Sequence, residues 1–212
     1  MIRHRPLERG FAAGLAALAG YVDAIGFLHL GGYFVSFMSG NSTRLGVGLV
    51  YDLSEAAVPA LLIVSFVGGV VIGAFVGVAA LRHKRRAVLL CVALLLLAAA
   101  LLHAGSFPSL AMIFAAAAMG ASNGTFERDG EVSIGVTYMT GTLVKLGQRI
   151  AGALLGGDRL AWSWYLFLWL GLVAGAGIGA AVYREIGLGG LWYAAGAFAI
   201  ASMVVPRDNG GP

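Results

Sequence analysis

Six stretches of the sequence are apolar over a length that crosses a lipid bilayer, and this feature most limits the possible folds. About 20 helical residues span the roughly 30 Å hydrocarbon layer. Hydrophobic residues make up 59% of the chain and charged residues 11%, too few charges to cover the surface of a soluble protein. The sequence therefore predicts an all-α polytopic membrane protein. Its expected spanning helices cover residues 11–30, 57–81, 87–104, 108–126, 161–183 and 187–205.

Two further stretches, residues 32–50 and 132–155, are apolar but are interrupted by Ser, Thr, Asn and Gly. Basic residues cluster before the first span and again at residues 82–86, and cytoplasmic loops are enriched in Lys and Arg. Two clusters on one side of a membrane are separated by an even number of crossings. We therefore expect residues 32–50 to dip into the bilayer and return, and we treat residues 132–155 in the same way.

This topology has six transmembrane helices plus two re-entrant or broken helical segments. It places both termini and residues 82–86 in the cytoplasm, and it places Asp52 and Glu55 outside. In the eight-span alternative both interrupted stretches cross, and residues 82–86 then face outward. The charge asymmetry disfavours that alternative.

The two interrupted stretches also resemble each other. Residues 36–46 read SFMSGNSTRLG and residues 137–147 read TYMTGTLVKLG, at an offset of 101 residues. Upstream, Asp23 in GYVD aligns with Asn123 in GASN. The pattern predicts a first repeat over residues 1–105 and a second over residues 106–212, together forming one membrane domain. Because each repeat holds three spans, the second enters from the opposite side, giving an inverted-topology repeat like those of many transporters.

Glycines recur at four-residue spacing in one predicted helix of each repeat. Small residues at this spacing lie on one helix face and let backbones approach closely. We expect these faces to hold the re-entrant stretches within one chain, with a homodimer contact as the second choice. The aligned sets are Gly69, Gly73 and Gly77 in the first repeat and Gly171, Gly175 and Gly179 in the second.

Each interrupted stretch carries residues suited to a binding site at a helix start. Gly40 and Gly141 are the expected bending points, and Asn41 or Thr142 would then begin a short helix as its N-cap. Free N–H groups at two such starts, facing each other near the midplane, would bind an anion or the negative end of a polar solute. The alternative is that small residues only allow close packing. The predicted solute-binding residues are Asp23, Ser39, Gly40, Asn41, Thr43, Arg44, Asn123, Thr140, Gly141, Thr142 and Lys145.

Three charged residues in this set leave alternatives open. Arg44 and Lys145 follow the breaks, where a cation opposes the helix dipole. Each would attract an anionic solute, pair with an acid or extend to the membrane interface. Asp23 lies well inside the first span, where a carboxyl costs about 2.5–3.5 kcal/mol. It would carry a coupling proton, bind a cation, hold Arg44 or a re-entrant N–H, or serve the structure alone.

Residues 127–129, at the cytoplasmic end of the fourth span, are Glu127, Arg128 and Asp129. We expect a solvated loop there, with a gate as the sharper hypothesis. The sequence contains no phosphate-binding loop, zinc-type spacing or nucleophile elbow, so we expect no cofactor, no metal and no enzymatic activity. Cys91 is the single cysteine. The cluster at residues 82–86 follows from topology, so nucleic-acid binding is not expected.

The motifs GYVDAIGF, FMSGN, GASN and VTYMTGT together resemble those of the YoaK-like family of bacterial inner-membrane proteins, a family of unknown function. The resemblance covers nearly the whole chain and rests on a Met-Ser/Thr-Gly-Asn/Thr signature in each half. It implies a multi-pass protein of the bacterial inner membrane and supplies no substrate. Thr142 departs from the Asn expected there, which weakens an amide role in the second half.

These features predict a transporter or channel for a small polar or ionic solute, with an anion slightly favoured. Its partners would be the lipid bilayer and that solute. An intramembrane enzyme using Asp23 is one alternative, and it would require a second titratable group at the same depth. A non-transporting scaffold or membrane sensor is the other, and it would have no water-accessible cavity at the breaks.

Overall fold

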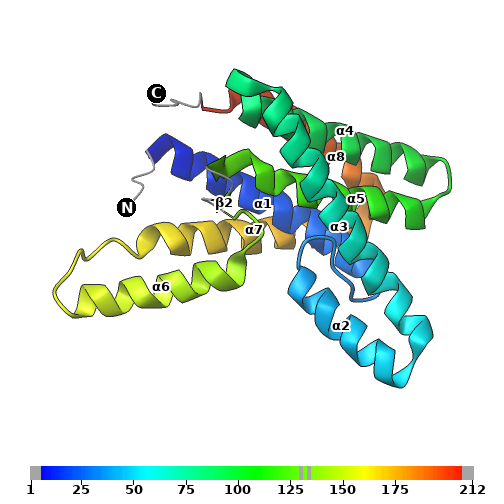
Figure 1. Ribbon diagram of the computed structural model, residues 1–212, viewed down its shortest axis with the longest axis horizontal. Coiled ribbons are helices and arrows are strands. Elements are labelled where there is room, and N and C mark those ends of the chain that lie inside the picture. The colour runs from blue at the N-terminus through cyan, green and yellow to red at the C-terminus, as the bar shows by residue number, and fades with distance from the viewer. Residues whose placement is uncertain (1–5, 129–130, 133–134, 207–212) are drawn as a thin grey trace.

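The computed structural model describes residues 6–128, 131–132 and 135–206, which form α-helices, short 3-10 turns and one small hairpin (Figure 1). The α-helices are α1 Pro6–His29, α2 Met38–Tyr51, α3 Leu53–Ala79, α4 Lys84–Ala104, α5 Pro108–Ser122, α6 Met139–Leu154, α7 Ser163–Ile186 and α8 Leu191–Val204. The 3-10 turns are η1 Leu81–His83, η2 Asn123–Phe126 and η3 Gly187–Gly190, and strand β1 Glu127–Arg128 pairs with β2 Glu131–Val132 in antiparallel fashion.

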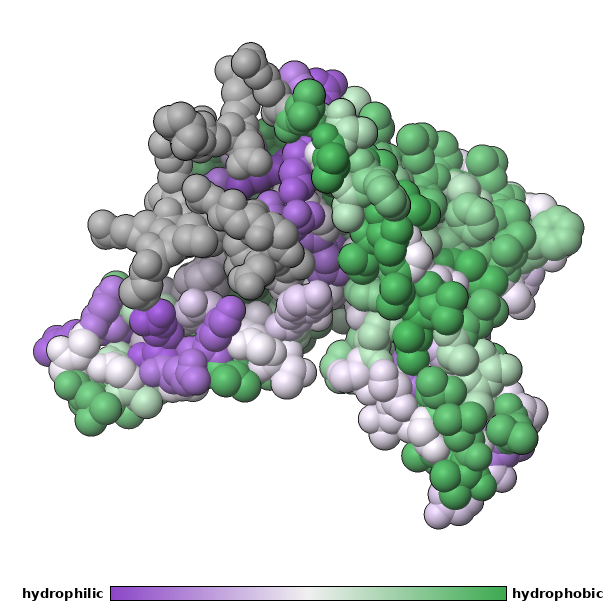
Figure 2. All heavy atoms as spheres, in the orientation of Figure 1, coloured by the Kyte–Doolittle hydropathy of each residue, from purple (hydrophilic) through white to green (hydrophobic). Residues whose placement is uncertain are grey.

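Five segments of the described chain are long and apolar enough to cross a membrane. They are Leu7–His29, Leu53–Ala79, Lys84–Ala104, Pro108–Phe126 and Ser163–Val204. The last segment contains both α7 and α8. Gly187, which has a φ of 57°, ends α7 between them. Many large apolar side chains are exposed on these helices, and Figure 2 shows them spread over the right half of the view. The protein is therefore a multi-pass α-helical membrane protein.

Local chemistry explains where helices start. Pro108 occupies the first turn of α5, where its missing N–H has no helical partner to lose. Asp52 caps α3, because its Oδ1 accepts hydrogen bonds from the Ser54 hydroxyl at 2.7 Å and the Ser54 N–H at 2.9 Å. These bonds hold the pKa of the Asp52 carboxyl below its usual value. The turn between α2 and α3 is thereby fixed at a single residue.

Ion pairs place the N-terminal part of α1 beside the start of α4. Arg85 Nη1 lies 2.9 Å from Glu8 Oε1, and Lys84 Nζ lies 3.2 Å from Glu127 Oε1. The Arg9 guanidinium lies 5.7 Å from the centre of the Trp164 ring at the start of α7. We call the end of the molecule that contains these residues, Glu8, Arg9, Lys84, Arg85, Glu127 and Trp164, the basic end. The basic segment around Arg85 and the start of α1 thus share one end, as the even-crossing argument requires.

Two parallel helix pairs interlock the halves of the chain. On α7, Gly171, Gly175 and Gly179 meet the backbone of α1 at Ala13, Ala17 and Tyr21 in that order. On α3, Gly69 and Gly73 meet the backbone of α5 at Ala117 and Ala121. Helices α1 and α7 therefore run away from the basic end, whereas α3 and α5 run toward it.

These contacts correct two sequence predictions about the glycines. Gly69 occupies the position against α5 that Gly175, not Gly171, occupies against α1, so the predicted alignment is wrong by one helical turn. The glycine faces also hold α1 and α5 rather than the interrupted stretches. Gly77 instead faces the aliphatic part of the Lys84 side chain. The glycine faces therefore pack within one chain, and the predicted homodimer contact stays a prediction.

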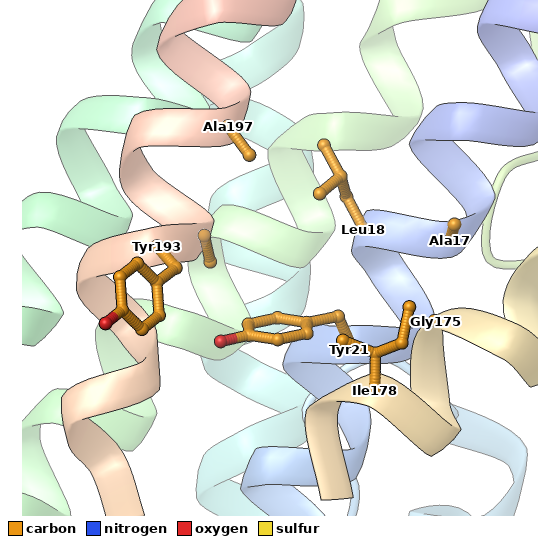
Figure 3. Close-up of a pocket in the computed structure, with 8 residues that line it drawn as sticks. Ala17, Leu18, Tyr21, Gly175, Ile178, Tyr193 and Ala197 are labelled. Atoms are coloured by element: carbon orange, nitrogen blue, oxygen red, sulfur yellow. The ribbon is translucent and has the colours of Figure 1, made fainter. Parts of the chain in front are cut away.

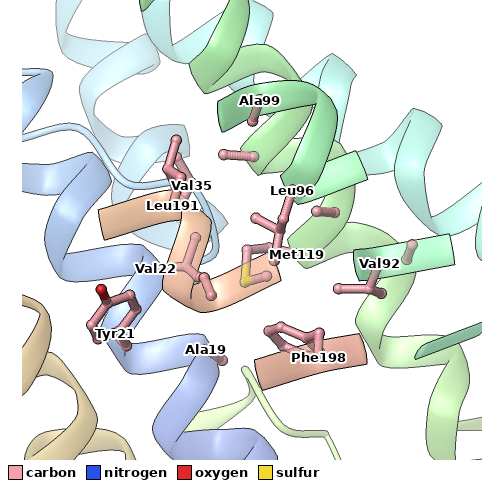
Figure 4. Packing of buried hydrophobic residues seen from close by; sticks show 14 of the residues in the cluster. Ala19, Tyr21, Val22, Val35, Val92, Leu96, Ala99, Met119, Leu191 and Phe198 are labelled. Atoms are coloured by element: carbon pink, nitrogen blue, oxygen red, sulfur yellow. The ribbon is translucent and has the colours of Figure 1, made fainter. Parts of the chain in front are cut away.

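The core lies where α1, α4, α5 and α8 meet (Figure 4). Leu96, Met119, Leu191 and Phe198 are among its fully buried side chains. Val35, from the non-helical connection between α1 and α2, is also fully buried in this core. It packs so tightly on Gly26 that a Cβ there would lie 2.7 Å from Val35 Cγ1. The core thus anchors the segment from which α2 begins.

Helices α2 and α6 diverge from the rest of the molecule as two arms (Figure 1). The first arm is α2 packed on the start of α3, and the second is α6 with the start of α7. A helix of 14 or 16 residues is about 21–24 Å long, shorter than the bilayer core. Figure 2 shows a wide notch between the arms at the lower edge of the view. The two arms do not meet.

The predicted bending points are wrong. Gly40 and Gly141 have helical backbone, because α2 begins at Met38 and α6 at Met139. The first chain break instead follows α1, where Gly31 and Gly32 have φ values of 67° and 107°. Glycine adopts this left-handed region without steric cost, and the Gly32 N–H closes the end of α1 by donating to the Phe27 carbonyl at 2.8 Å.

We predict that the close glycine contacts limit stability. A Cβ at Gly69 or Gly175 would overlap a backbone carbonyl oxygen of the neighbouring helix, and overpacking of this kind costs about 1–3 kcal/mol or more. Gly69→Ala and Gly175→Ala should therefore unfold at lower denaturant in detergent micelles, followed by circular dichroism. The matched controls are Gly68→Ala and Gly177→Ala, where a Cβ meets nothing within 4 Å. Equal stability of the two pairs would contradict the observed packing.

Candidate functional site

Asp23 holds the non-helical segment that precedes α2. Its Oδ1 accepts hydrogen bonds from the Val35 N–H at 2.9 Å and from the Ser36 N–H at 2.8 Å. Backbone N–H groups at membrane depth need such partners because lipid offers none. Of the predicted roles for Asp23, holding backbone N–H groups of the interrupted stretch is the one that the geometry displays.

Asn41 fastens the same segment from the other side. Its Oδ1 accepts from the Phe34 N–H at 3.0 Å, and its Nδ2 donates to the Phe34 carbonyl at 2.6 Å. The side chain is completely buried. Asn41 lies inside the first turn of α2 rather than at its N-cap, which is Phe37. The amide therefore acts as a backbone mimic that closes the loop onto the helix.

Aromatic side chains complete the first arm's base. Phe34 packs on Phe27 and Phe37, with ring centroids 4.9 and 5.1 Å apart. A Cβ at Gly40 would lie 2.6 Å from the Phe37 ring, so Gly40 is required for this packing and not for a bend. The Arg44 guanidinium lies 5.0 Å from the Tyr33 ring centre. No ion pair between Arg44 and Asp23 exists in the described residues.

The second half uses different bonds at the equivalent place. Asn123 Nδ2 donates to the Met119 carbonyl at 3.1 Å and to the Gly120 carbonyl at 3.4 Å, closing the end of α5. Its Oδ1 accepts from the Thr137 hydroxyl at 3.0 Å instead of from a backbone N–H. In the part of the chain that the structure describes, the N–H groups of Val136 and Thr137 have no hydrogen-bond partner. The segment before α6 is thus less completely satisfied than the one before α2.

A polar hollow of about 360 Å³ lies between α6 and α7. Lys145, Gln148 and Arg149 line it from α6, and Tyr165 lines it from the start of α7. Residues at positions i, i+3 and i+4 share one helix face. The hydrophilic patch on the left arm in Figure 2 belongs to this region. Two cations, an amide and a phenol therefore converge near the basic end.

The other predicted site residues have local roles or stand apart. Thr43 and Thr142 donate their hydroxyls to the carbonyls of Ser39 and Tyr138 in the preceding helical turn. Thr140 and Gly141 are exposed on α6. Of the gate candidates, Glu127 forms the ion pair with Lys84. The Arg128 side chain and Asp129 lie outside the described residues. The structure thus separates the predicted residues into two sites, one in each arm.

A second cavity of about 230 Å³ lies between α1, α7 and α8 (Figure 3). It is lined almost wholly by apolar groups, including Leu18, Ile178 and Ala197. Tyr21 also lines this cavity, and its hydroxyl donates to the Gly190 carbonyl at 2.9 Å. Apolar walls of this kind offer little selection for a polar ligand. No group of three or more metal-ligating side chains occurs among the described residues.

Residues 11–204 match the family described as "Protein of unknown function (DUF1275)". The chain belongs to this family. It is also 38% identical over 213 residues to the UPF0700 transmembrane protein RA0705 of Rhizobium meliloti (strain 1021), an alignment that covers 98% of this chain and 92% of the relative. No solved structure matches the chain significantly.

Membership of the DUF1275 family confirms part of the sequence resemblance. An uncharacterised family of transmembrane proteins was expected, and both comparisons support it. The narrower assignment to YoaK-like proteins, with its repeated signature, stays a prediction. The family description names no activity.

Sequence reasoning missed three of the four described residues that line the polar hollow. Gln148, Arg149 and Tyr165 lie outside the repeated motif that directed attention to Lys145. A signal for two of them exists, because Lys145, Gln148 and Arg149 form a polar stripe along an otherwise apolar helix. Tyr165 comes from another helix, and only the fold brings it to this place.

We predict that Asp23 stabilises the fold through the hydrogen bonds that its carboxylate accepts. Asp23→Ala leaves two N–H groups without an acceptor, at about 1–3 kcal/mol each. Asp23→Asn keeps an acceptor but loses the charge that makes such bonds roughly twice as strong, so its stability should lie between those of Asp23→Ala and the native protein. Unfolding in mixed micelles measures this order. Glu185→Ala, which removes an exposed carboxylate, is the matched control, and equal stability of Asp23→Ala and this control would refute the role.

Proposed function

We propose that this protein is a transporter or channel for a small polar or ionic solute, with an anion favoured. The observation that carries the proposal is the pair of short helices, α2 and α6, that start from non-helical backbone beside Asp23 and Asn123. Broken backbone at membrane depth is tolerated only where it is buried in protein or lines water. Transporters use discontinuous helices of this kind at their solute sites.

The proposed topology has six crossings, by α1, α3, α4, α5, α7 and α8, with α2 and α6 as re-entrant segments. The opposed directions of the α1–α7 and α3–α5 pairs support an inverted-topology repeat. So does the common end shared by Glu8 and Arg85, which an even number of crossings must separate. The excess of basic residues at this end favours the cytoplasm for it, with both termini there and with the chain in the bacterial inner membrane.

The route favoured for the solute follows the polar face of α6 in the second arm. This face runs from the hollow at Arg149 and Lys145 toward the unpartnered N–H groups of Val136 and Thr137. Cationic side chains followed by free N–H groups attract an anion. The first arm is less suitable, because the corresponding N–H groups there already donate hydrogen bonds to Asp23. The route therefore replaces the midplane meeting of two breaks, which the divergent arms do not form.

We predict the sidedness of four single-cysteine variants made in a Cys91→Ser background. Cysteines at Arg86 and Asp158 should react with a membrane-impermeant maleimide only from the cytoplasmic side. Cysteines at Asp52 and Ser106 should react only from the outside, because α3 and α4 each connect the basic end to the opposite end. Labelling of intact cells and of inverted vesicles provides the measurement. Outward labelling at position 86 would overturn the six-crossing topology.

We predict anion flux through the purified protein in liposomes. The probes are chloride, nitrate, acetate and inorganic phosphate, measured as electrical currents on a solid-supported membrane. At least one should give a protein-dependent signal, and Lys145→Gln with Arg149→Gln should reduce it about tenfold or more, equivalent to about 1.4 kcal/mol.

The matched control carries Arg86→Gln with Arg159→Gln, which removes two exposed charges that do not line the hollow and should keep the native signal. Signals no larger than those of empty liposomes for every probe would argue against transport of these anions. Equal loss in both double variants would argue against the α6 route.

A further inference from the structure

We propose that the hollow formed by Lys145, Gln148, Arg149 and Tyr165 is a binding site for a phosphate group. The site lies between α6 and α7 near the basic end, with about 360 Å³ of space. Small-ligand pockets have volumes of roughly 300–1,000 Å³, so a phosphate with a modest organic part fits there.

The donor set matches a phosphate better than a single-atom anion. The Arg149 guanidinium presents a planar fork of N–H groups that bonds two phosphate oxygens at once. Lys145 adds a compact charge, whereas the Gln148 amide and the Tyr165 hydroxyl add neutral donors. A tetrahedral anion with several oxygens can use donors that approach from two helices, which a halide cannot do to the same extent.

The two cations of the hollow are not engaged elsewhere. Arg85, Lys84 and Arg184 are paired with carboxylates, and Arg9 and Arg44 lie over aromatic rings. In the described residues, by contrast, neither Lys145 nor Arg149 has an ion pair or a ring contact. Two cations that share one hollow repel each other, so an anion between them lowers the free energy of the folded state.

The phosphate has two possible sources. Basic pockets between transmembrane helices on the cytoplasmic side bind anionic lipid head groups, and the start of α7 lies at the basic end beside Arg9. Alternatively the phosphate belongs to a free solute at the mouth of the α6 route. Only the second form rests on the proposed transport function.

The test is ligand-dependent melting of the purified full chain in mild detergent at constant ionic strength. The probes are inorganic phosphate, compared with chloride, and short-chain phosphatidylglycerol, compared with short-chain phosphatidylcholine. A ligand at one hundred times its Kd should raise the melting temperature of a protein of this size by about 5–10 °C. The double variant Lys145→Gln with Arg149→Gln should lose this rise, and Arg86→Gln with Arg159→Gln should keep it.

The result identifies the source. A rise with inorganic phosphate indicates a free phosphate solute, and a rise with phosphatidylglycerol alone indicates a lipid head group. The proposal is overturned if neither probe raises the melting temperature or if the double variant responds like the native protein. Arg149→Lys keeps the charge and removes the fork, so an unchanged response of this milder variant also overturns it. The melting test measures binding and the liposome test measures flux. Binding in the first without flux in the second, or flux without binding, would therefore separate this proposal from the proposed function.

Discussion

The structure depends on one constraint, which is that backbone N–H groups at membrane depth must find acceptors within the protein. The chain leaves α1 through Gly31 and Gly32, turns back and crosses residues 33–37 without helical hydrogen bonds. Asp23 and Asn41 supply the acceptors that this segment lacks. A carboxylate inside a span is costly, and its bonds to the two N–H groups of Val35 and Ser36 offset that cost. The position of α2 follows from these bonds and from the burial of Val35.

Hydropathy predicted the long apolar helices, and charge predicted that Glu8 and Arg85 share one end, because both are properties of composition along the chain. The start of α2 was misjudged. Gly40 was expected to bend the chain, yet the Gly31–Gly32 pair does so, and Gly40 admits the Phe37 ring. Which glycine bends and which one packs depends on neighbours that only the fold supplies. The register of the glycine faces was missed for the same reason, since a shift of four residues preserves the spacing.

Packing between the halves explains why they form one unit. Helix α1 of the first half packs on α7 of the second half, with backbone-to-backbone contact at Gly175. Helix α5 of the second half packs on α3 of the first half, with such contact at Gly69. Neither half can bury these glycine faces alone. In lipid the hydrophobic effect does not drive helices together, so close contact through small residues supplies the attraction instead. The glycines therefore determine how the two halves assemble. The arms α2 and α6 project from the core that these helices form.

Asp23 stands before the first arm where Asn123 stands before the second, and this difference makes the two arms chemically unequal. In the first arm a built-in carboxylate occupies the N–H groups before the helix, so that arm already holds its own anion. In the second arm an amide turns its donors back to α5. Among the described residues the N–H groups of Val136 and Thr137 have no hydrogen-bond partner, and the helix that follows carries Lys145 and Arg149. An external anion in the second arm would occupy the place that Asp23 occupies in the first. The proposed binding route therefore needs only the second arm, and the positive charge of α6 favours an anion there.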